Sequence, residues 1–206
     1  MRKTQFTAID SPIRVIEFLD MQTIHCTQKL LKELGKQSAT IPESRPQKGF
    51  LGPWHANLIR IDRRKCVLFT NDLTLYSFLV PEVKKTDLVK FRELFLIHLK
   101  ANLIKEGFGM GDINKALGEC DEINVAPTKN RSVLGSMNDF VRQLEFIISR
   151  FGGLDRTDML AVNMEINRIP MGTFKKYGFP IRKLYELFGR RDKIVFDMPF
   201  PDQDIQ

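Results

Sequence analysis

Three short runs of β-branched, aromatic and leucine residues follow one another between residues 54 and 80, WHANLIRIDRRKCVLFTNDLTLYSFLV. Each run has the length of a strand, and side chains of these types fit a pleated, half-buried surface. The breaks at 62–65 (DRRK) and 71–72 (ND) contain Asp and Asn, which suit tight turns because they tolerate left-handed backbone geometry and bond nearby backbone groups. The stretch therefore predicts an antiparallel meander.

The last of these runs carries apolar side chains on both of its sides. Alternate residues of a strand face opposite sides of a sheet, so one side holds Leu73, Leu75 and Leu79 and the other holds Tyr76, Phe78 and Val80. Two long segments, 86–106 and 131–151, have apolar residues at spacings of three and four and can cover the two faces as amphipathic helices. The expected fold class is α+β, with an antiparallel sheet of about four or five strands centred on the 54–80 meander.

Shorter elements complete this prediction. Residues 157–169 fit the periodicity of a strand or of a helix, and the candidate caps Asp155 and Thr157 favour the helix. Pro180 suits the first position of a last helix. The remaining expected elements are a strand over 22–27, a short helix over 29–34, a loop over 35–53, a short helix over 112–120 and a strand over 122–127.

The chain has 206 residues, a length that suits one domain with its own hydrophobic core. We expect a single α+β domain over 21–188, an N-terminal extension over 1–20 and a C-terminal tail over 189–206. Met21 is a candidate alternative start because a strand-like segment follows it directly.

The amino-acid composition indicates where in the cell the protein is located and which kinds of partner it can bind. The three cysteines are widely spaced and lie in or beside apolar segments, which indicates reduced thiols and a cytoplasmic location. No stretch approaches the roughly 18 apolar residues of a membrane span, so we expect no membrane partner. Lys and Arg number 32 against 25 Asp and Glu, a formal charge of +7 that favours contact with polyanions.

The clearest candidate binding site is the start of the 131–151 helix. A helix N-terminus carries unpaired N–H groups and a partial positive charge, and here Lys129, Arg131 and the Ser132 hydroxyl could add donors for a phosphate or carboxylate. The alternative is that Asn130 only caps the helix while the two cations face solvent.

His55 is the second candidate. Either His55 or His25 could act as a base, and His55 could also serve as the base of a cysteine nucleophile with Asn57 as the orienting group. A metal set of two histidines with Cys26 and Cys66 lacks the close ligand pairs of structural zinc sites, so we expect no metal and no other cofactor.

Arg63 and Arg64 lie in the first turn of the meander, whose strands carry the aromatic residues Trp54, Phe69, Tyr76 and Phe78. Basic and aromatic residues together suggest a sheet on which nucleic-acid bases could stack. The alternative is that these aromatic residues belong to the core. The chain has no P-loop, GxGxxG, HExxH, GxSxG or CxxC motif, so no reaction can be named.

Four motifs, taken together, give the chain a family resemblance: IHCTQKLLKEL at 24–34, WHANL at 54–58, RRKCVLFTNDLTLYSF at 63–78 and RSVLGSMND at 131–139. The chain resembles a family of uncharacterised bacterial proteins classed as a domain of unknown function. The resemblance spans roughly 21–187 and implies a bacterial, cytoplasmic, stand-alone domain, with no activity attached.

The expected function is binding of nucleic acid or of another phosphate-bearing ligand. Lys129, Arg131 and Ser132 would form this site, with Arg63 and Arg64 contributing. Two alternatives stay open: a small enzyme that acts on a phosphorylated or carboxylated metabolite with His55 or His25 as its base, and a protein-interaction component of a bacterial defence or toxin system.

Overall fold

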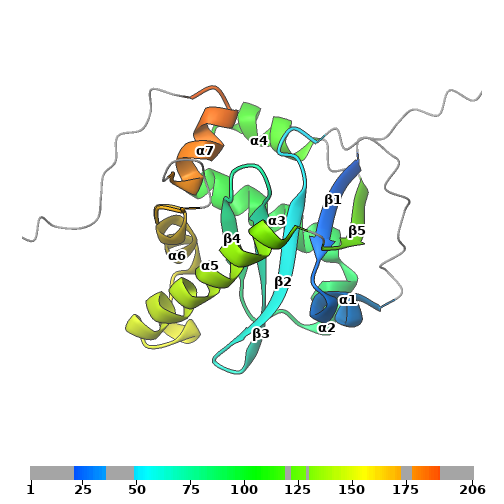
Figure 1. Cartoon of the computed structure of the whole chain (residues 1–206), viewed down its shortest axis with the longest axis vertical. Coiled ribbons are helices and arrows are strands. Elements are labelled where there is room, and N and C mark those ends of the chain that lie inside the picture. Colours follow the sequence, from blue (N-terminus) through cyan, green and yellow to red (C-terminus); the bar gives the residue numbers. More distant parts are fainter. Residues whose placement is uncertain (1–20, 36–48, 119–121, 129, 173–177, 191–206) are drawn as a thin grey trace, which may run out of the picture.

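A computed structural model of the chain describes residues 21–35, 49–118, 122–128, 130–172 and 178–190. These residues form one five-stranded sheet with helices against both faces (Figure 1). The strand order is β4-β3-β2-β1-β5. The strands are β1 (Met21–Cys26), β2 (Trp54–Ile61), β3 (Arg64–Asn71), β4 (Ser77–Val80) and β5 (Glu122–Pro127).

The α+β class is confirmed, and β2, β3 and β4 form the antiparallel meander expected from the sequence. The sheet as a whole is mixed, however, because β1 runs parallel to both β2 and β5. The expectation of a purely antiparallel sheet was therefore wrong. After β1 the chain passes through α1 (Gln28–Leu34) and returns beside β1 in the same direction, and such a return needs a crossover connection rather than a hairpin.

The two turns of the meander differ. Asp62 and Arg63 both have positive φ, 49° and 65°, as in the two-residue turns whose twist matches that of their flanking strands. In the second turn the Asn71 side chain accepts hydrogen bonds from the backbone N–H of Leu73 and Thr74, and Leu75 takes the positive φ. The last strand consequently begins at Ser77, four residues later than the sequence suggested.

The helices lie close to their expected positions. The expected 86–106 helix is interrupted at Lys90, and the ambiguous 157–169 stretch contains a helix capped by the side chain of Asp158. None of the helices in the described ranges is long and apolar enough to cross a bilayer. After α1 they are α2 (Lys85–Val89), α3 (Phe91–Lys105), α4 (Met110–Leu117), α5 (Arg131–Arg150), the 3₁₀ turn η2 (Leu154–Arg156), α6 (Met159–Ile166) and α7 (Pro180–Leu187).

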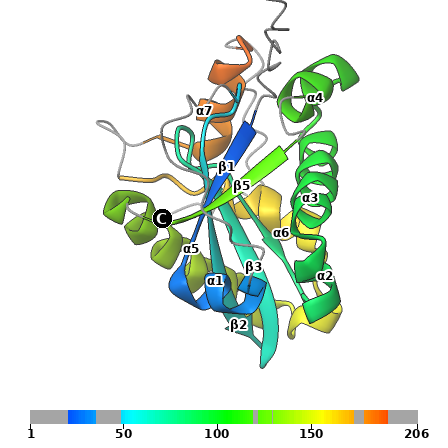
Figure 2. The same ribbon diagram turned by 90° about the vertical axis from the view of Figure 1, so that its right-hand side faces the viewer.

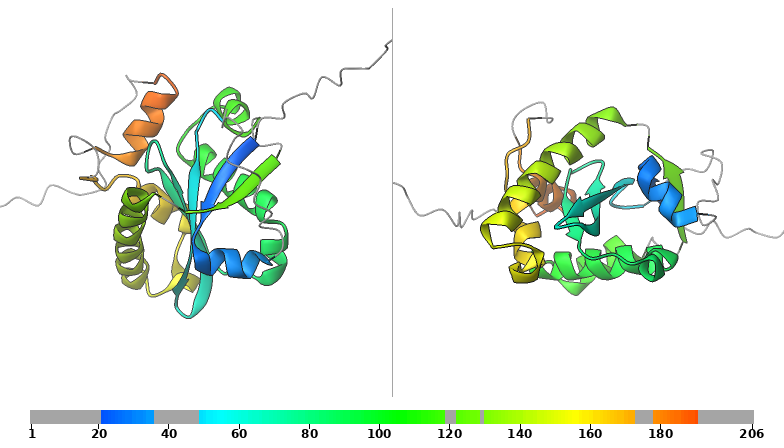
Figure 3. Two further views of the ribbon diagram at one scale, coloured as in Figure 1. Left: turned by 45° about the vertical axis from the view of Figure 1, so that its right-hand side comes forward. Right: turned by 90° about the horizontal axis from the view of Figure 1, so that it is seen from below.

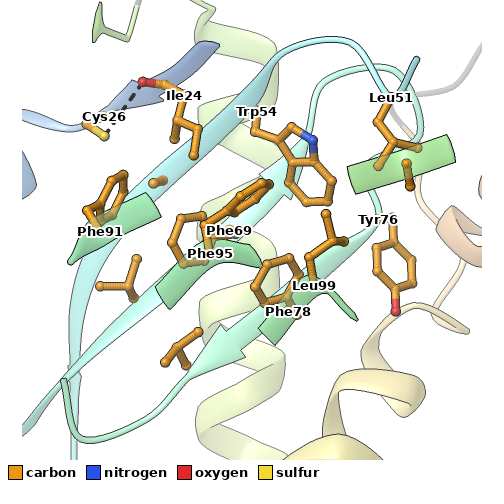
Figure 4. Packing of buried hydrophobic residues seen from close by; sticks show 14 of the residues in the cluster. Ile24, Cys26, Leu51, Trp54, Phe69, Tyr76, Phe78, Phe91, Phe95 and Leu99 are labelled. Carbon is orange, nitrogen blue, oxygen red and sulfur yellow. Dashed lines mark hydrogen bonds between the residues drawn. The ribbon is translucent and has the colours of Figure 1, made fainter. Parts of the chain in front are cut away.

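The first face of the sheet packs against α3 through aromatic side chains. Trp54, Phe69 and Phe78 from three neighbouring strands surround Phe95 of α3, and all four are fully buried (Figure 4). The Trp54 and Phe95 rings meet edge to face with centroids 5.2 Å apart, an arrangement that adds attraction to simple burial. Helices α1, α2, α4 and α7 add further side chains to the same cluster.

The second face packs against α5, which lies on the opposite side of the sheet from α3 (Figure 3), and against side chains of α6. Phe140 and Leu144 of α5 belong to an apolar cluster with Leu68 of β3 and Leu79 of β4. Among the buried residues that the structure describes, this cluster takes members from β2, β3 and β4 but none from β1 or β5. The described hydrophobic residues that the sheet contributes to this cluster thus come from one half of the sheet.

Helix α6 also closes the outer edge of β4. Asn167 accepts a hydrogen bond from Ser77 N–H at 2.7 Å and donates one to Ser77 C=O at 2.6 Å. Asn163, one turn earlier, pairs in the same way with Leu79. Both asparagine side chains are buried and replace a neighbouring strand, so this edge is not available for pairing with another chain.

Candidate functional site

The residues expected to bind an anion lie at the first turn of α5. Arg131 and Ser132 are exposed there, and Lys129 lies outside the described residues. The Asn130 side chain accepts hydrogen bonds from the backbone N–H of Ser132 and Val133. Asn130 therefore caps the helix, and the groups left for a ligand at this point are the side chains of Arg131 and Ser132.

Arg63 and Arg64 lie at the other end of α5. The Arg64 guanidinium forms a bidentate ion pair with Asp155, with both N···O distances 2.6 Å, and also contacts Glu82. Asp155 follows the C-terminus of α5, and a 20-residue helix is about 30 Å long at roughly 1.5 Å per residue. The structure thus does not bring Arg63 and Arg64 together with Arg131.

The aromatic residues of the meander do not form an exposed stacking surface. Trp54, Phe69, Tyr76 and Phe78 are all fully buried in the cluster on the first face. Their place in the core agrees with the alternative interpretation of these residues.

His55 lies buried on the second face of the sheet, outside the apolar cluster that α5 and α6 form there. Its neighbours in the strand, Trp54 and Ala56, both point into the first-face cluster, so His55 points the opposite way. The same alternation puts His25 of β1 on the second face, directly beside His55 in the pairing of the two strands. Their ring centroids are 5.1 Å apart.

Strand β5 extends this row of polar residues. Val125 belongs to the first-face cluster, so Asn124 and Ala126 face the second side, where Ala126 pairs with His25 and Asn124 with Thr23. The backbone N–H of Thr128 bonds to the carbonyl of Cys26 and continues the ladder. Figure 2 faces the edge formed by β5 and β1. We call Thr23, His25, His55, Asn124 and Thr128 the polar strip.

Asp72 fixes the orientation of His55. Its Oδ1 lies 2.6 Å from Nδ1 of a histidine that is only 1% exposed. Because a carboxylate only accepts, Nδ1 carries the proton in this pair, and Nε2 of the neutral ring presents a lone pair. A carboxylate that holds an imidazole in one tautomer is the arrangement found where histidine acts as a base.

Three buried polar atoms of the polar strip have no hydrogen-bond partner in the described structure: His55 Nε2, Asn124 Oδ1 and Thr128 Oγ1. Other polar side chains on the same face are paired. Thr70 and Ser77 bond to each other at 2.8 Å. Trp54 Nε1 and the Tyr76 hydroxyl, in the first-face cluster, are also without a partner among the described residues. Buried polar atoms are nearly always satisfied in folded proteins, so three unsatisfied atoms on one face, from β2, β5 and the residue after β5, mark this place as unusual.

The two described cysteines, Cys26 and Cys66, do not lie with these histidines. Cys26 belongs to the first-face cluster, on the opposite side of β1 from His25, and burial raises the pKa of its thiol. Cys66 pairs with Ile59, four residues along β2 from His55, and its pKa is also raised by burial. Within the described residues, which do not include Cys120, the structure therefore assembles neither the two-histidine, two-cysteine metal set nor a cysteine nucleophile beside His55.

Sequence reasoning named His55 but missed Asn124, and it did not place Asp72 or Thr128 with this histidine. The available signal was the occurrence of polar residues at alternate positions of two otherwise apolar segments. The polar residues are His25 in IHC (24–26) and Asn124 and Thr128 in INVAPT (123–128). That signal could be interpreted only after β1 was known to pair with β5.

A second buried polar group joins α3 to the C-terminal helices. The Glu106 carboxylate, inaccessible to solvent, forms a bidentate ion pair with Arg168, and its backbone carbonyl accepts from the Tyr185 hydroxyl at 2.6 Å. Burial raises the pKa of Glu106, and Arg168 opposes that rise. Every oxygen in this group has a partner, so we assign it to the stability of the fold.

Comparison with known proteins gives one family. No curated protein and no solved structure gives a significant match to the chain. A family model described as a domain of unknown function (DUF6933) matches residues 23–183, which include every strand after the first two residues of β1 and the first half of α7. The chain belongs to this family of domains of unknown function.

Proposed function

We propose that this domain binds a small ligand with a phosphate or carboxylate group. The ligand would lie against the polar strip, with its anionic group held by the side chains of Arg131 and Ser132. The observation that carries this proposal is the presence of unpaired buried polar atoms on β2, on β5 and at Thr128, three residues before the first residue of α5.

The topology supports this position. In sheets with parallel strands, ligands bind outside the carboxyl ends of those strands, where neighbouring connections leave in different directions. Here β1 and β5 are parallel neighbours, and their carboxyl ends lead to α1 and α5. Thr128 and Arg131 follow the carboxyl end of β5 directly.

Charge at this corner favours an anion. The first turn of α5 contains no acidic side chain, and the positive end of the helix dipole lies there. Asn130 occupies two of the backbone donors, so the Arg131 guanidinium and the Ser132 hydroxyl would make the principal contacts.

A small ligand fits these observations better than nucleic acid does. The aromatic side chains that could stack on bases are buried, and Arg64 is held by Asp155 and Glu82. Arg63 and Arg131 lie at opposite ends of α5, so they cannot both contact one phosphate group.

A second candidate function is catalysis with His55 as a general base. The observation in its favour is the short contact between Asp72 and His55, which leaves Nε2 free to accept a proton. A ligand at the Arg131 corner and a base on the neighbouring strands would together form the active site of a small enzyme.

The binding proposal is tested by calorimetric titration with methyl phosphate and inorganic phosphate. We expect saturable binding that Arg131→Ala weakens roughly tenfold, since a charge-assisted hydrogen bond contributes about 1.5–3 kcal/mol. Arg142→Ala is the matched control, because Arg142 is an exposed cation on the same helix, beside Asp139, and its loss should leave binding unchanged.

Two results would overturn the proposal. One is the absence of phosphate binding to the wild-type protein. The other is equal weakening by the two arginine substitutions, which would indicate a general effect of positive charge. Tight binding of a single-stranded oligonucleotide with a steep dependence on salt would favour nucleic acid instead.

A further inference from the structure

We infer that the organic part of the ligand carries several hydroxyl groups, as in a sugar phosphate, and that these hydroxyls donate hydrogen bonds to His55 Nε2 and Asn124 Oδ1. This inference rests on the proposed function and specifies its ligand. It follows from which of the atoms in the polar strip can accept a hydrogen bond and which can donate one.

His55 offers an acceptor. Its Nδ1 proton is directed at Asp72 Oδ1, and the unpaired atom is Nε2, which lies in a side chain that is 1% exposed. In the neutral ring Nε2 has a lone pair and no proton. A ligand that satisfies this atom must therefore bring an O–H or N–H group.

His25 offers a second acceptor beside the first. Its Nδ1 lies 3.3 Å from the carbonyl oxygen of Pro127, and because a carbonyl only accepts, Nδ1 is the protonated nitrogen. The neutral ring then also presents Nε2 as a lone pair. The tautomers of the two adjacent histidines are thus set by two acceptors of the protein, Asp72 and the Pro127 carbonyl.

Strand β5 adds oxygen atoms to this set. The unpaired atom of Asn124 is Oδ1, an acceptor, in a residue that is only 6% exposed. Thr128 Oγ1 can donate or accept. The four groups together offer three acceptors and one hydroxyl, so the complementary ligand has several donors.

A ligand with hydroxyl groups and a phosphate matches both this requirement and the anion-binding corner at Arg131. A phosphate alone has acceptor oxygens that would face the lone pairs of His55 and Asn124. A phosphorylated polyol or sugar presents its phosphate to Arg131 and its hydroxyls to the strip. Discrimination in favour of hydroxyls is expected because an analogue without them leaves buried acceptors unpaired.

The test compares two phosphate monoesters by calorimetry, ribose 5-phosphate and methyl phosphate. We expect ribose 5-phosphate to bind at least about tenfold more tightly, because each additional hydrogen bond to a buried acceptor contributes a net gain in binding free energy. Asn124→Leu should remove most of this advantage while methyl phosphate still binds. Thr70→Val is the matched control, because the Thr70 hydroxyl lies on the same face but already bonds to Ser77.

Folding of the variants is checked by thermal denaturation without ligand. If the Asn124 oxygen is kept for a ligand, Asn124→Leu should melt about 2–4 °C higher than the wild type, because it removes an unpaired buried acceptor. A lower melting temperature would mean that Asn124 has a structural role and would overturn the inference.

The remaining outcomes separate this inference from the proposed function. If neither monoester binds, the proposed function fails. If both bind equally and Asn124→Leu changes neither, the anion site stands and the hydroxyl inference is overturned. If Zn²⁺ alone stabilises the protein and His55→Gln abolishes this effect, the lone pairs serve a metal and the inference is also overturned.

Discussion

The two faces of the sheet carry side chains of different character. The first face is aromatic and closed: Trp54, Phe69 and Phe78 pack on Phe95 of α3 without an intervening polar side chain (Figure 4). The second face is divided between an apolar half under α5 and α6 and the polar strip on β1, β2 and β5. Within the described parts of the chain, unpaired buried atoms occur on both faces, but on the first face they belong to core aromatic residues, Trp54 and Tyr76, whereas on the second face three of them belong to the polar strip.

Polar atoms on the second face also differ among themselves. Asn163 and Asn167 hydrogen-bond to backbone groups at the edge of β4, and the Thr70 hydroxyl bonds to the Ser77 hydroxyl. The side-chain oxygen of Asn124, in contrast, has no partner within the described ranges. A buried polar atom without a partner destabilises a protein by about 1–3 kcal/mol. Its persistence is the physical reason for assigning it to ligand binding.

The largest effect is expected on the first face. Phe95→Ala should lower the free energy of unfolding by about 3–5 kcal/mol, because the lost ring leaves a cavity among fully buried aromatic side chains. Urea denaturation measures the change. Ile97→Ala, on the exposed side of the same helix, should alter stability by less than about 0.5 kcal/mol. Equal effects of the two substitutions would mean that Phe95 is not a core residue.

A smaller effect is expected at the β4 edge. Asn167→Leu should destabilise the protein by about 2–3 kcal/mol, since the N–H and C=O of Ser77 lose their partners in a buried place. Hydrogen exchange at Ser77 N–H should also become faster, whereas exchange in β2 should change little. A variant as stable as the wild type would show that Asn167 does not hold this edge.

A pH-dependent effect is expected at Glu106. Because its pKa is raised in the folded protein, the folded state holds more protons than the unfolded state between the ordinary glutamate pKa and the raised value, so wild-type stability falls as pH rises through this interval. Glu106→Gln lacks this dependence. In denaturation experiments between about pH 4 and about pH 7, the free energy of unfolding of the variant relative to the wild type should increase with pH. A constant difference would contradict the raised pKa.

Sequence patterns predicted the meander and the two covering segments because their periodicity is local. Runs such as 66–70 and the apolar stripe of 131–151 reveal strands and helices without knowledge of their partners. The parallel pairing of β1 had no such local signal. It depends on a crossover of more than 20 residues between Cys26 and Trp54, and nothing in residues 22–27 distinguishes a parallel strand from an antiparallel one.

The candidate site was predictable only in part for the same reason. His55, Arg131 and Ser132 could be chosen by residue type, since histidine and a basic helix start are chemically conspicuous. Asn124 and Thr128 are not conspicuous, and they reach the histidines only because β5 joins the far side of β1. Arg63 and Arg64 were grouped with Arg131 because of their charge, although the full length of α5 separates them from Arg131.

The most direct test of this account is one pair of Asn→Leu substitutions in the ligand-free protein, followed by urea denaturation. Asn167→Leu removes a side chain with backbone partners, and Asn124→Leu removes one with an unpaired oxygen. The account predicts opposite signs, with Asn167→Leu less stable than the wild type and Asn124→Leu more stable by about 1 kcal/mol. Loss of stability in both variants would contradict the account, because the polar strip would then be part of the framework of the fold.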